Sequence, residues 1–254
     1  MRTIVLLAKA YGKKRKQLID LVQSEISTII EELDAELVNF STDKRGHFIV
    51  RIQGQDSEFV FNILAKNYGS SISFDRITEG KIFKGFLVDV GKVGYGLYVD
   101  IAITNHTRTD VLIPLHRIRS QFGLNRPLRF LVDSLVLVDN LPVEVKITSI
   151  DKHNEKLEAE FGLETLTRFE QWMHDDHERL LVFGANSTII DNALRKSGHL
   201  EDIYEIENLG IFEYALVCKR STRASGILAA IGPRLQGIPM HLFIPKEIEA
   251  KLNA

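Results

Sequence analysis

The chain has 254 residues, of which 44% are hydrophobic and 26% are charged, as in an ordinary globular protein of two or three domains. Its single cysteine excludes an internal disulfide framework and favours a reducing compartment. The formal net charge of -2 excludes a uniformly basic protein, so any nucleic-acid site has to be a local patch.

The apolar run near the N terminus, TIVLLA, is too short for a signal peptide, and its positive charges follow it instead of preceding it. No apolar run approaches the roughly 20 residues that a helix needs to cross a bilayer. We therefore expect a cytoplasmic protein that makes no contact with a membrane.

Residues 1–78 have the pattern of a small α+β domain. A buried strand is predicted at 3–9, and apolar residues at helical spacing predict a helix over 13–33. Asp56 is placed to begin a second helix that stops at Gly69. Further strands are predicted at 36–41, 47–54 and 71–74. The predicted order is β-α-β-β-α-β.

Residues 79–162 are almost entirely strand-like. The runs VEVKITSI (143–150) and KLEAEF (156–161) alternate apolar and polar residues, so each has one buried and one wet face. With two strands in the glycine-rich stretch 80–101 and one in DVLIPL (110–115), they make five strands, enough for a small closed barrel. A helical insertion is predicted at about 117–138. The bends and bulges that tight closure needs are assigned to Gly85, Gly91, Gly94 and Gly96.

A linking helix is predicted within 163–177, with Trp172 packed across the junction between the barrel and the last domain. Residues 178–254 then repeat the order β-α-β-β-α-β, which is that of the split β-α-β arrangement called ferredoxin-like. The predicted fold class is α+β, with two ferredoxin-like domains flanking a β-barrel.

Four runs of the barrel segment follow one another with the order and spacing of a known domain. They are VGKVGYGLYVDI (90–101), DVLIPLH (110–116), VDNLPVEVKITSID (138–151) and KLEAEF (156–161). Together they resemble the S1 RNA-binding domain, a member of the OB-fold group, over about a third of the chain.

In S1 domains the aromatic residues of the second strand lie on the nucleic-acid face, which implies the same role for Tyr95 and Tyr98. These residues are three apart, so a bulge near Gly96 is needed to turn both outward. Exposed rings stack on bases without reading their sequence. The alternative is that both rings plug the barrel or a seam between domains. Where S1 domains commonly offer a histidine this chain has Pro114, and His116 lies two residues beyond.

A cluster of arginines follows the predicted third strand, in a run, HRIRSQFGLNRPLRF (116–130), that contains no acidic residue. Such a cluster beside the aromatic strand could neutralise phosphates. The alternative is a solvated helix face that forms salt bridges with a neighbouring domain. The residues predicted to bind nucleic acid beside the tyrosines are Lys84, Lys92, His116, Arg117, Arg119, Arg126 and Arg129.

A second anion site is predicted where KRSTRASG (219–226) leads from a strand into a helix, and the alternative is an ordinary capped loop. Its predicted phosphate-binding residues are Lys219, Arg220, Ser221 and Arg223. His174 and His177 have helical spacing but no identifiable third ligand, so no metal is predicted. No catalytic or dinucleotide motif is recognisable, so no catalytic residue and no cofactor is predicted.

Taken whole, the chain resembles an archaeal family of conserved proteins of unknown function, through LGIFEYALVCK (209–219) and IGPRL (231–235). That resemblance implies an archaeal cytoplasm but no activity. The barrel favours non-catalytic binding of single-stranded RNA, ribosomal or transcript, with protein partners in a ribonucleoprotein or transcription complex. The alternatives are a protein-interaction scaffold that binds no nucleic acid, and an RNA-modifying enzyme whose cofactor pocket would lie at 219–226.

Overall fold

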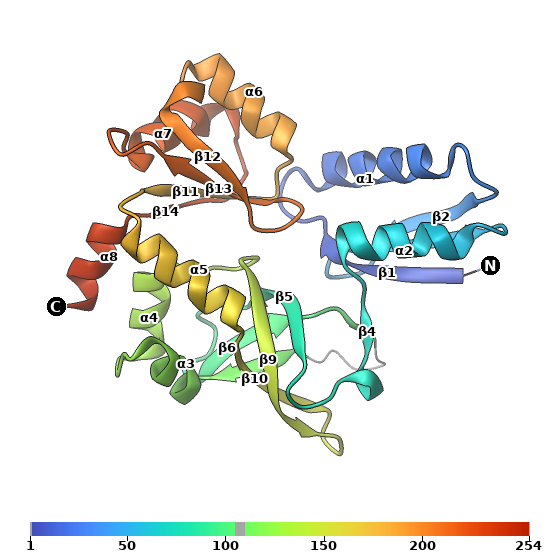
Figure 1. Cartoon of the computed structure of the whole chain (residues 1–254), viewed down its shortest axis with the longest axis horizontal. Coiled ribbons are helices and arrows are strands. Elements are labelled where there is room, and N and C mark those ends of the chain that lie inside the picture. Colours follow the sequence, from blue (N-terminus) through green and yellow to red (C-terminus); the bar gives the residue numbers. More distant parts are fainter. Residues whose placement is uncertain (1, 105–109, 254) are drawn as a thin grey trace.

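The computed structural model describes residues 2–104 and 110–253 of the chain (Figure 1). It is a mixed α+β structure with a closed five-stranded barrel. Figure 1 shows the barrel (green) at the bottom, the N-terminal region (blue to cyan) to the right and the C-terminal region (orange to red) above. In the described ranges, every helix is too short or too polar to cross a bilayer.

The N-terminal region contains a three-stranded antiparallel sheet in the order β1-β3-β2. Two helices pack on it through apolar positions at helical spacing, including Leu18 and Val22 of α1 and Val60 and Leu64 of α2. The elements of this region are β1 (Arg2–Lys9), α1 (Arg15–Ile30), β2 (Glu36–Thr42), β3 (His47–Gln53), α2 (Ser57–Tyr68), β4 (Ile72–Ser73) and the 3-10 helix η1 (Phe74–Arg76).

The strand predicted at 71–74 does not join this sheet as its fourth strand. The chain runs beside β1 only at the single bridge between Leu6 and Ser70. It then turns towards the barrel, where β4 pairs in parallel with β7. The N-terminal sheet is therefore one strand smaller than a ferredoxin-like sheet, and the missing strand ties the region to the barrel instead.

The barrel closes in the strand order β10-β8-β6-β5-β9, which confirms the predicted five-stranded closure. Close approach of neighbouring strands explains two of the glycines. A Cβ on Gly96 would lie 2.5 Å from the carbonyl oxygen of Ile113, and one on Gly85 would lie 2.6 Å from that of Asp100. The elements are β5 (Ile82–Val88), β6 (Gly96–Asp100), β7 (Ile103–Thr104), β8 (Val111–Pro114), α3 (Leu115–Phe122), α4 (Leu128–Leu135), β9 (Pro142–Asp151) and β10 (Lys156–Phe161).

The C-terminal region has a four-stranded antiparallel sheet in the order β12-β13-β11-β14. The element order β-α-β-β-α-β agrees with the expected pattern, and the ferredoxin-like assignment stays a prediction. A helix after the last strand was not predicted. The elements are α5 (Leu163–His174), β11 (Arg179–Phe183), α6 (Ser187–Ser197), η2 (Leu200–Asp202), β12 (Ile203–Asn208), β13 (Glu213–Cys218), α7 (Ala224–Ile231), η3 (Gly232–Arg234), β14 (Met240–Phe243) and α8 (Pro245–Leu252).

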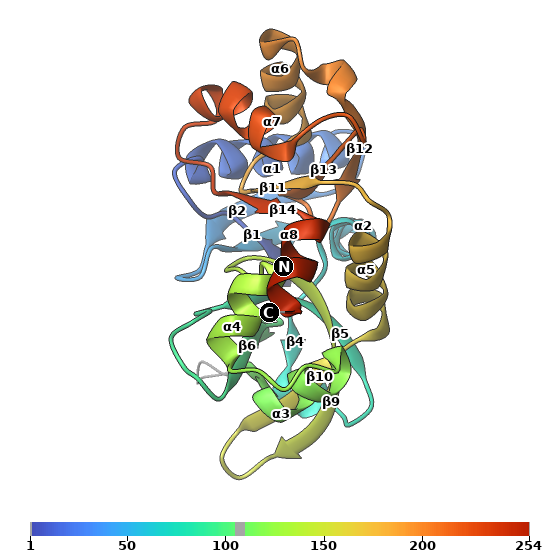
Figure 2. The ribbon, with the colours of Figure 1, turned by 90° about the vertical axis from the view of Figure 1, so that its left-hand side faces the viewer.

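Both faces of the C-terminal sheet pack against other parts of the chain. One face packs on α6 and α7 and contains the buried Cys218. The other face shares a single apolar core with the barrel, and Phe169 and Trp172 of α5 lie in that core against Phe243. The predicted packing of Trp172 across this junction is therefore confirmed. Figure 2 shows α8 between the C-terminal sheet and the barrel, where it contacts α4 and α5.

Candidate nucleic-acid surface on the barrel

Tyr95 and Tyr98 form a pair on the outside of the barrel. Tyr98 points outward from β6, because its neighbours Leu97 and Val99 point into the core. The two hydroxyl oxygens are 2.7 Å apart, and the rings meet edge to face with centroids 6.4 Å apart. The side chain of Tyr95 is 56% exposed. The rings therefore do not plug the barrel.

The pair forms without the bulge that the sequence suggested. Pairing of β6 with β8 is regular from Gly96, opposite Pro114, to Val99. Tyr95 lies immediately before the strand, where its carbonyl oxygen accepts a hydrogen bond from the backbone N–H of Leu115 at 2.8 Å. Because Tyr95 lies outside the regular strand, the alternation of inward and outward side chains along β6 does not turn its ring inward.

The contact between the tyrosines keeps the phenol of Tyr98 protonated. The hydrogen bond with Tyr95 is the largest cause that raises the pKa of Tyr98 to about 12, followed by partial burial, and the negative charge of Asp110 adds a smaller part. Tyr98 therefore stays uncharged throughout the ordinary pH range.

Two of the predicted lysines are already paired with acids. Lys84 Nζ lies 2.9 Å from a carboxylate oxygen of Glu164 on α5, and Lys92 Nζ lies 2.6 Å from Asp89 within the β5–β6 turn. Both pairs are exposed, and such pairs contribute little stability. A phosphate could compete for either lysine, but neither is a free cation.

The predicted arginines of α3, α4 and the loop between them divide into two groups. Arg117 forms an ion pair with Glu160 of β10 at 3.4 Å. Arg119 donates from Nε to the backbone carbonyl of Arg126 at 2.8 Å, and the guanidinium of Arg126 lies over the ring of Phe130. Within the described part of the chain, Arg119 and Arg126 form no ion pair, so their charges are not cancelled by an acid.

The remaining predicted residues of this surface are exposed. His116 is the second residue of α3 and Arg129 is the second residue of α4, and both side chains face solvent. The hydrogen bond between Tyr95 and Leu115 places the start of α3, and His116 with it, beside the tyrosine pair. The structure thus places the start of the arginine-rich insertion beside the tyrosines.

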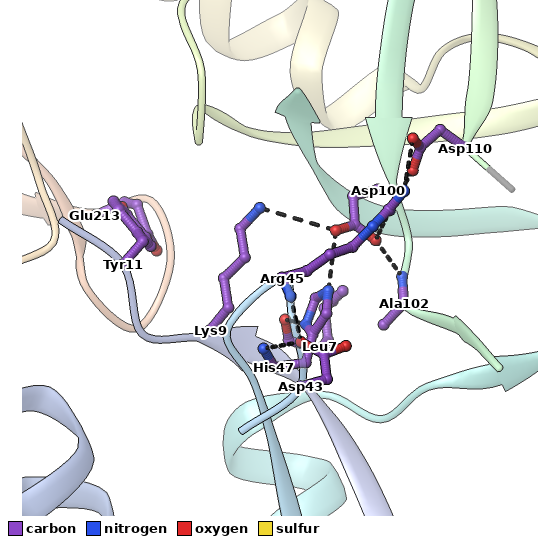
Figure 3. Close-up of polar contacts among 10 residues, drawn as sticks. All are labelled: Leu7, Lys9, Tyr11, Asp43, Arg45, His47, Asp100, Ala102, Asp110 and Glu213. Carbon is purple, nitrogen blue, oxygen red and sulfur yellow. Dashed lines mark hydrogen bonds and ion pairs between the residues drawn. The ribbon is translucent and has the colours of Figure 1, made fainter. Parts of the chain in front are cut away.

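A cluster of buried charges that the sequence did not predict lies next to this surface. We call it the polar junction; it joins the N-terminal region to the barrel (Figure 3) and consists of Lys9, Arg45, His47, Asp100 and Asp110. Its centre is the carboxylate of Asp100, only 2% exposed.

Asp100 is held by groups from β1, β3 and the turn before β3. His47 Nε2 lies 2.9 Å from one carboxylate oxygen, Arg45 Nη1 lies 3.2 Å from the other, and Lys9 Nζ lies 3.9 Å away. Burial alone would raise the pKa of Asp100. The hydrogen bond from His47 and the positive charges outweigh burial and hold that pKa well below its usual range.

Arg45 also binds Asp110 in a two-pronged contact. Its Nη2 donates to Oδ2 of Asp110 at 2.8 Å, and its Nη1 contacts Oδ1. The backbone N–H groups of Arg45 and His47 both donate to Asp43, which fixes the turn that presents the guanidinium. The only signal in the sequence was a charged residue inside an apolar run, as in LLAKA (6–10) and LYVDIA (97–102).

A second buried contact joins the N-terminal region to the C-terminal region. The hydroxyl of Tyr11 donates to Glu213 at 2.6 Å (Figure 3). The backbone N–H of Phe212 donates to the same carboxylate at 3.2 Å. Burial raises the pKa of Glu213 to about 7. Phe212 itself packs in the N-terminal core, with its ring edge to face with that of Phe48.

An acid of this chain contacts part of the phosphate cradle predicted at 219–226. Glu178 accepts from Arg223 Nη1 at 2.6 Å and from the backbone N–H of Ala224, at the start of α7, at 2.8 Å. Lys219, Arg220 and Ser221 are exposed around it. A phosphate bound to Arg223 and this N–H would have to displace Glu178, and phosphate binding at this loop stays a prediction.

The two histidines considered for a metal face different backbone carbonyls. His174 Nδ1 contacts the carbonyl of Glu170, and His177 Nδ1 contacts that of Cys218, both at 2.7 Å. Among the residues that the structure describes, no group of three or more His, Cys, Asp or Glu side chains is placed to hold a metal ion.

Solved structures that match the chain include the solution structure of GSP13 from Bacillus subtilis, which is 16% identical with a TM-score of 0.24. That match covers 34% of this chain and 55% of GSP13. A chain in the a/eIF2alpha–aDim2p–rRNA complex from Pyrococcus horikoshii is 12% identical with a TM-score of 0.26, over 48% of this chain and 64% of that one. This chain therefore spans less than two thirds of the length of either.

Three domains of one family match consecutive parts of the sequence, whereas none of the curated proteins matches it. The DUF2110 N-terminal domain matches residues 3–73, the DUF2110 central domain matches residues 77–173, and the DUF2110 C-terminal domain matches residues 177–242. Since these matches cover most of the chain in the order of the family, the chain belongs to the DUF2110 family.

Proposed function

We propose that the barrel binds single-stranded RNA, without catalysis, on a surface centred on Tyr95 and Tyr98. The observation that carries this proposal is the exposed ring of Tyr95, held edge to face against Tyr98 on the outer wall of the barrel. A ring that is already fixed in orientation loses little entropy when a base stacks on it.

The arginine-rich insertion supports the same proposal. Arg119, Arg126 and Arg129 form no ion pair within the described residues. They lie on α3, on the loop after it and on α4, and α3 follows directly from β8, the strand that pairs with β6. Positive charge beside an aromatic platform is the arrangement by which proteins hold a single strand, with the rings contacting bases and the cations contacting phosphates.

The test is fluorescence anisotropy with a short labelled single-stranded RNA, at about 50 mM and about 200 mM salt. Stacking contributes roughly 1–3 kcal/mol per base, so Tyr95→Ala should weaken binding about 5- to 150-fold. Tyr95→Phe keeps the ring and should retain most of the affinity. Tyr204→Ala is the matched control, because Tyr204 is 67% exposed but lies on β12 in the C-terminal region.

The proposal predicts binding that weakens with salt and falls in the two alanine variants Tyr95→Ala and Tyr98→Ala but not in Tyr204→Ala. Absence of binding at low salt refutes it, and so does an equal loss in the control. In either case a protein-docking role replaces RNA binding. That role predicts that protein partners still co-purify with the chain after nuclease treatment.

A further inference from the structure

The tyrosine pair and the polar junction share the outer face of two barrel strands. Tyr98 of β6 lies opposite Leu112 of β8. Asp100 comes two residues after Tyr98, and Asp110 comes two residues before Leu112. Side chains two apart on a strand point to the same side, so Asp100 shares the outer face of β6 with Tyr98. Asp110 lies just before β8, and it is placed beside Asp100 by Arg45, whose guanidinium contacts both carboxylates. Two carboxylates therefore lie directly beside the proposed base-stacking rings.

Two acids at that position oppose the binding of a polyanion. The charge of Asp110 reaches the tyrosine surface, since it is one of the causes that raise the pKa of Tyr98. Asp110 is 19% exposed in its side chain, so solvent screens it only in part. An uncompensated carboxylate there would repel the phosphates of a strand stacked on Tyr95.

The N-terminal region supplies the compensating charge. Arg45 binds Asp110 through both terminal nitrogens and also reaches Asp100 at 3.2 Å. Asp100 has further partners in His47 and Lys9, whereas Arg45 is the cation paired with Asp110 among the described residues. The guanidinium itself is 20% exposed and lies at the border between the two regions.

We propose that Arg45 is a positioning residue for RNA binding: by covering Asp110 it makes the outer face of the barrel acceptable to a phosphate chain. The inference rests on the proposed function and adds the N-terminal region to it as a required part of the binding surface. The barrel alone would present its tyrosines next to bare carboxylates. Docking of the N-terminal region and binding of RNA are therefore coupled.

The test is a double-mutant cycle in the full chain, with Arg45→Met, Asp110→Asn and both together, measured by anisotropy with the same single-stranded RNA. Arg45→Met should weaken binding about tenfold at low salt and less at high salt, because screening reduces the repulsion. Asp110→Asn should bind more tightly than the natural chain. The double variant should recover most of the affinity. Arg2→Met is the matched control, since Arg2 pairs with Glu58 at the opposite end of β1.

Two results overturn the inference. In the first, Arg45→Met binds RNA as tightly as Arg2→Met. In the second, the double variant binds as weakly as Arg45→Met, which would mean that Arg45 does not act by covering Asp110. Limited proteolysis and thermal unfolding show whether Arg45→Met still folds and docks. If it does not, Asp110→Asn decides, because unchanged or weaker binding in that variant contradicts repulsion by Asp110. Absence of RNA binding by the natural chain refutes the proposed function itself, whereas binding with no effect at Arg45 and Asp110 refutes only this inference.

Discussion

Replacement of Glu213 by Gln should remove a specific pH dependence of stability. Glu213 is 1% exposed, and burial raises the pKa of its carboxyl group from an ordinary 4.5 to about 7. Between these two values the folded chain keeps a proton that the unfolded chain releases, so the free energy of unfolding falls as the pH rises through that window. At 1.36 kcal/mol per pH unit, the total fall is about 3 kcal/mol.

The assay is urea unfolding of the natural chain and of Glu213→Gln at a series of pH values from about 5 to about 8. The difference in the free energy of unfolding between the natural chain and Glu213→Gln should grow by about 2–3 kcal/mol across the series. It should become constant above about pH 7. The contributions of all other groups are common to both proteins and cancel in that difference. Glu58→Gln serves as the control, since Glu58 is exposed and pairs only with Arg2 in the described structure. A difference that does not change with pH would refute the assignment of a protonated Glu213 at this junction.

Three further substitutions test the packing and the polar junction. Phe212→Ala should destabilise the chain by about 3–5 kcal/mol in urea unfolding, because the ring fills the N-terminal core, whereas Tyr204→Ala on the surface should change little. Gly96→Ala should cost about 1–3 kcal/mol in thermal unfolding, because its Cβ would lie 2.5 Å from a carbonyl oxygen of β8, while Gly94→Ala meets nothing within 4 Å and should be nearly neutral. Asp100→Asn should lower stability at neutral pH by about 3–5 kcal/mol, since it leaves buried cations unpaired. Because the pKa of Asp100 lies below its usual range, the natural chain should lose this advantage as the pH falls below about 4, so circular dichroism in acid should show the two proteins converging.

Local patterns were sufficient for the barrel because each strand shows its buried face in its own sequence. Val143, Val145 and Ile147 alternate with polar residues and all point into the core. The outward position of Tyr98 follows from the same alternation. Tyr95 was expected to need a bulge to point outward. It needs none, because β6 begins at Gly96, one residue after Tyr95. Strand limits depend on pairing with β8, which a local pattern does not contain.

The parts that could not be predicted depend on contacts between distant residues. Arg45 and Asp110 are 65 positions apart, and neither has a neighbour in sequence that identifies its partner. The same holds for Glu178, which fills the start of α7 from 46 positions away. A run of cationic and hydroxyl side chains indicates that an anion can bind there. It does not indicate whether that anion is a ligand or a carboxylate of the same chain.

The shared apolar core of the barrel, α5 and the C-terminal sheet has a consequence for how the molecule opens. Trp172 and Phe243 pack in the same apolar cluster as the described barrel strands, so the barrel and the C-terminal sheet share one core. These two parts should exchange their amide hydrogens as one cooperative unit. The barrel and the C-terminal sheet thus form one unit, to which the N-terminal region is joined by the polar junction, by the pairing of β4 with β7 and by the ring of Phe212.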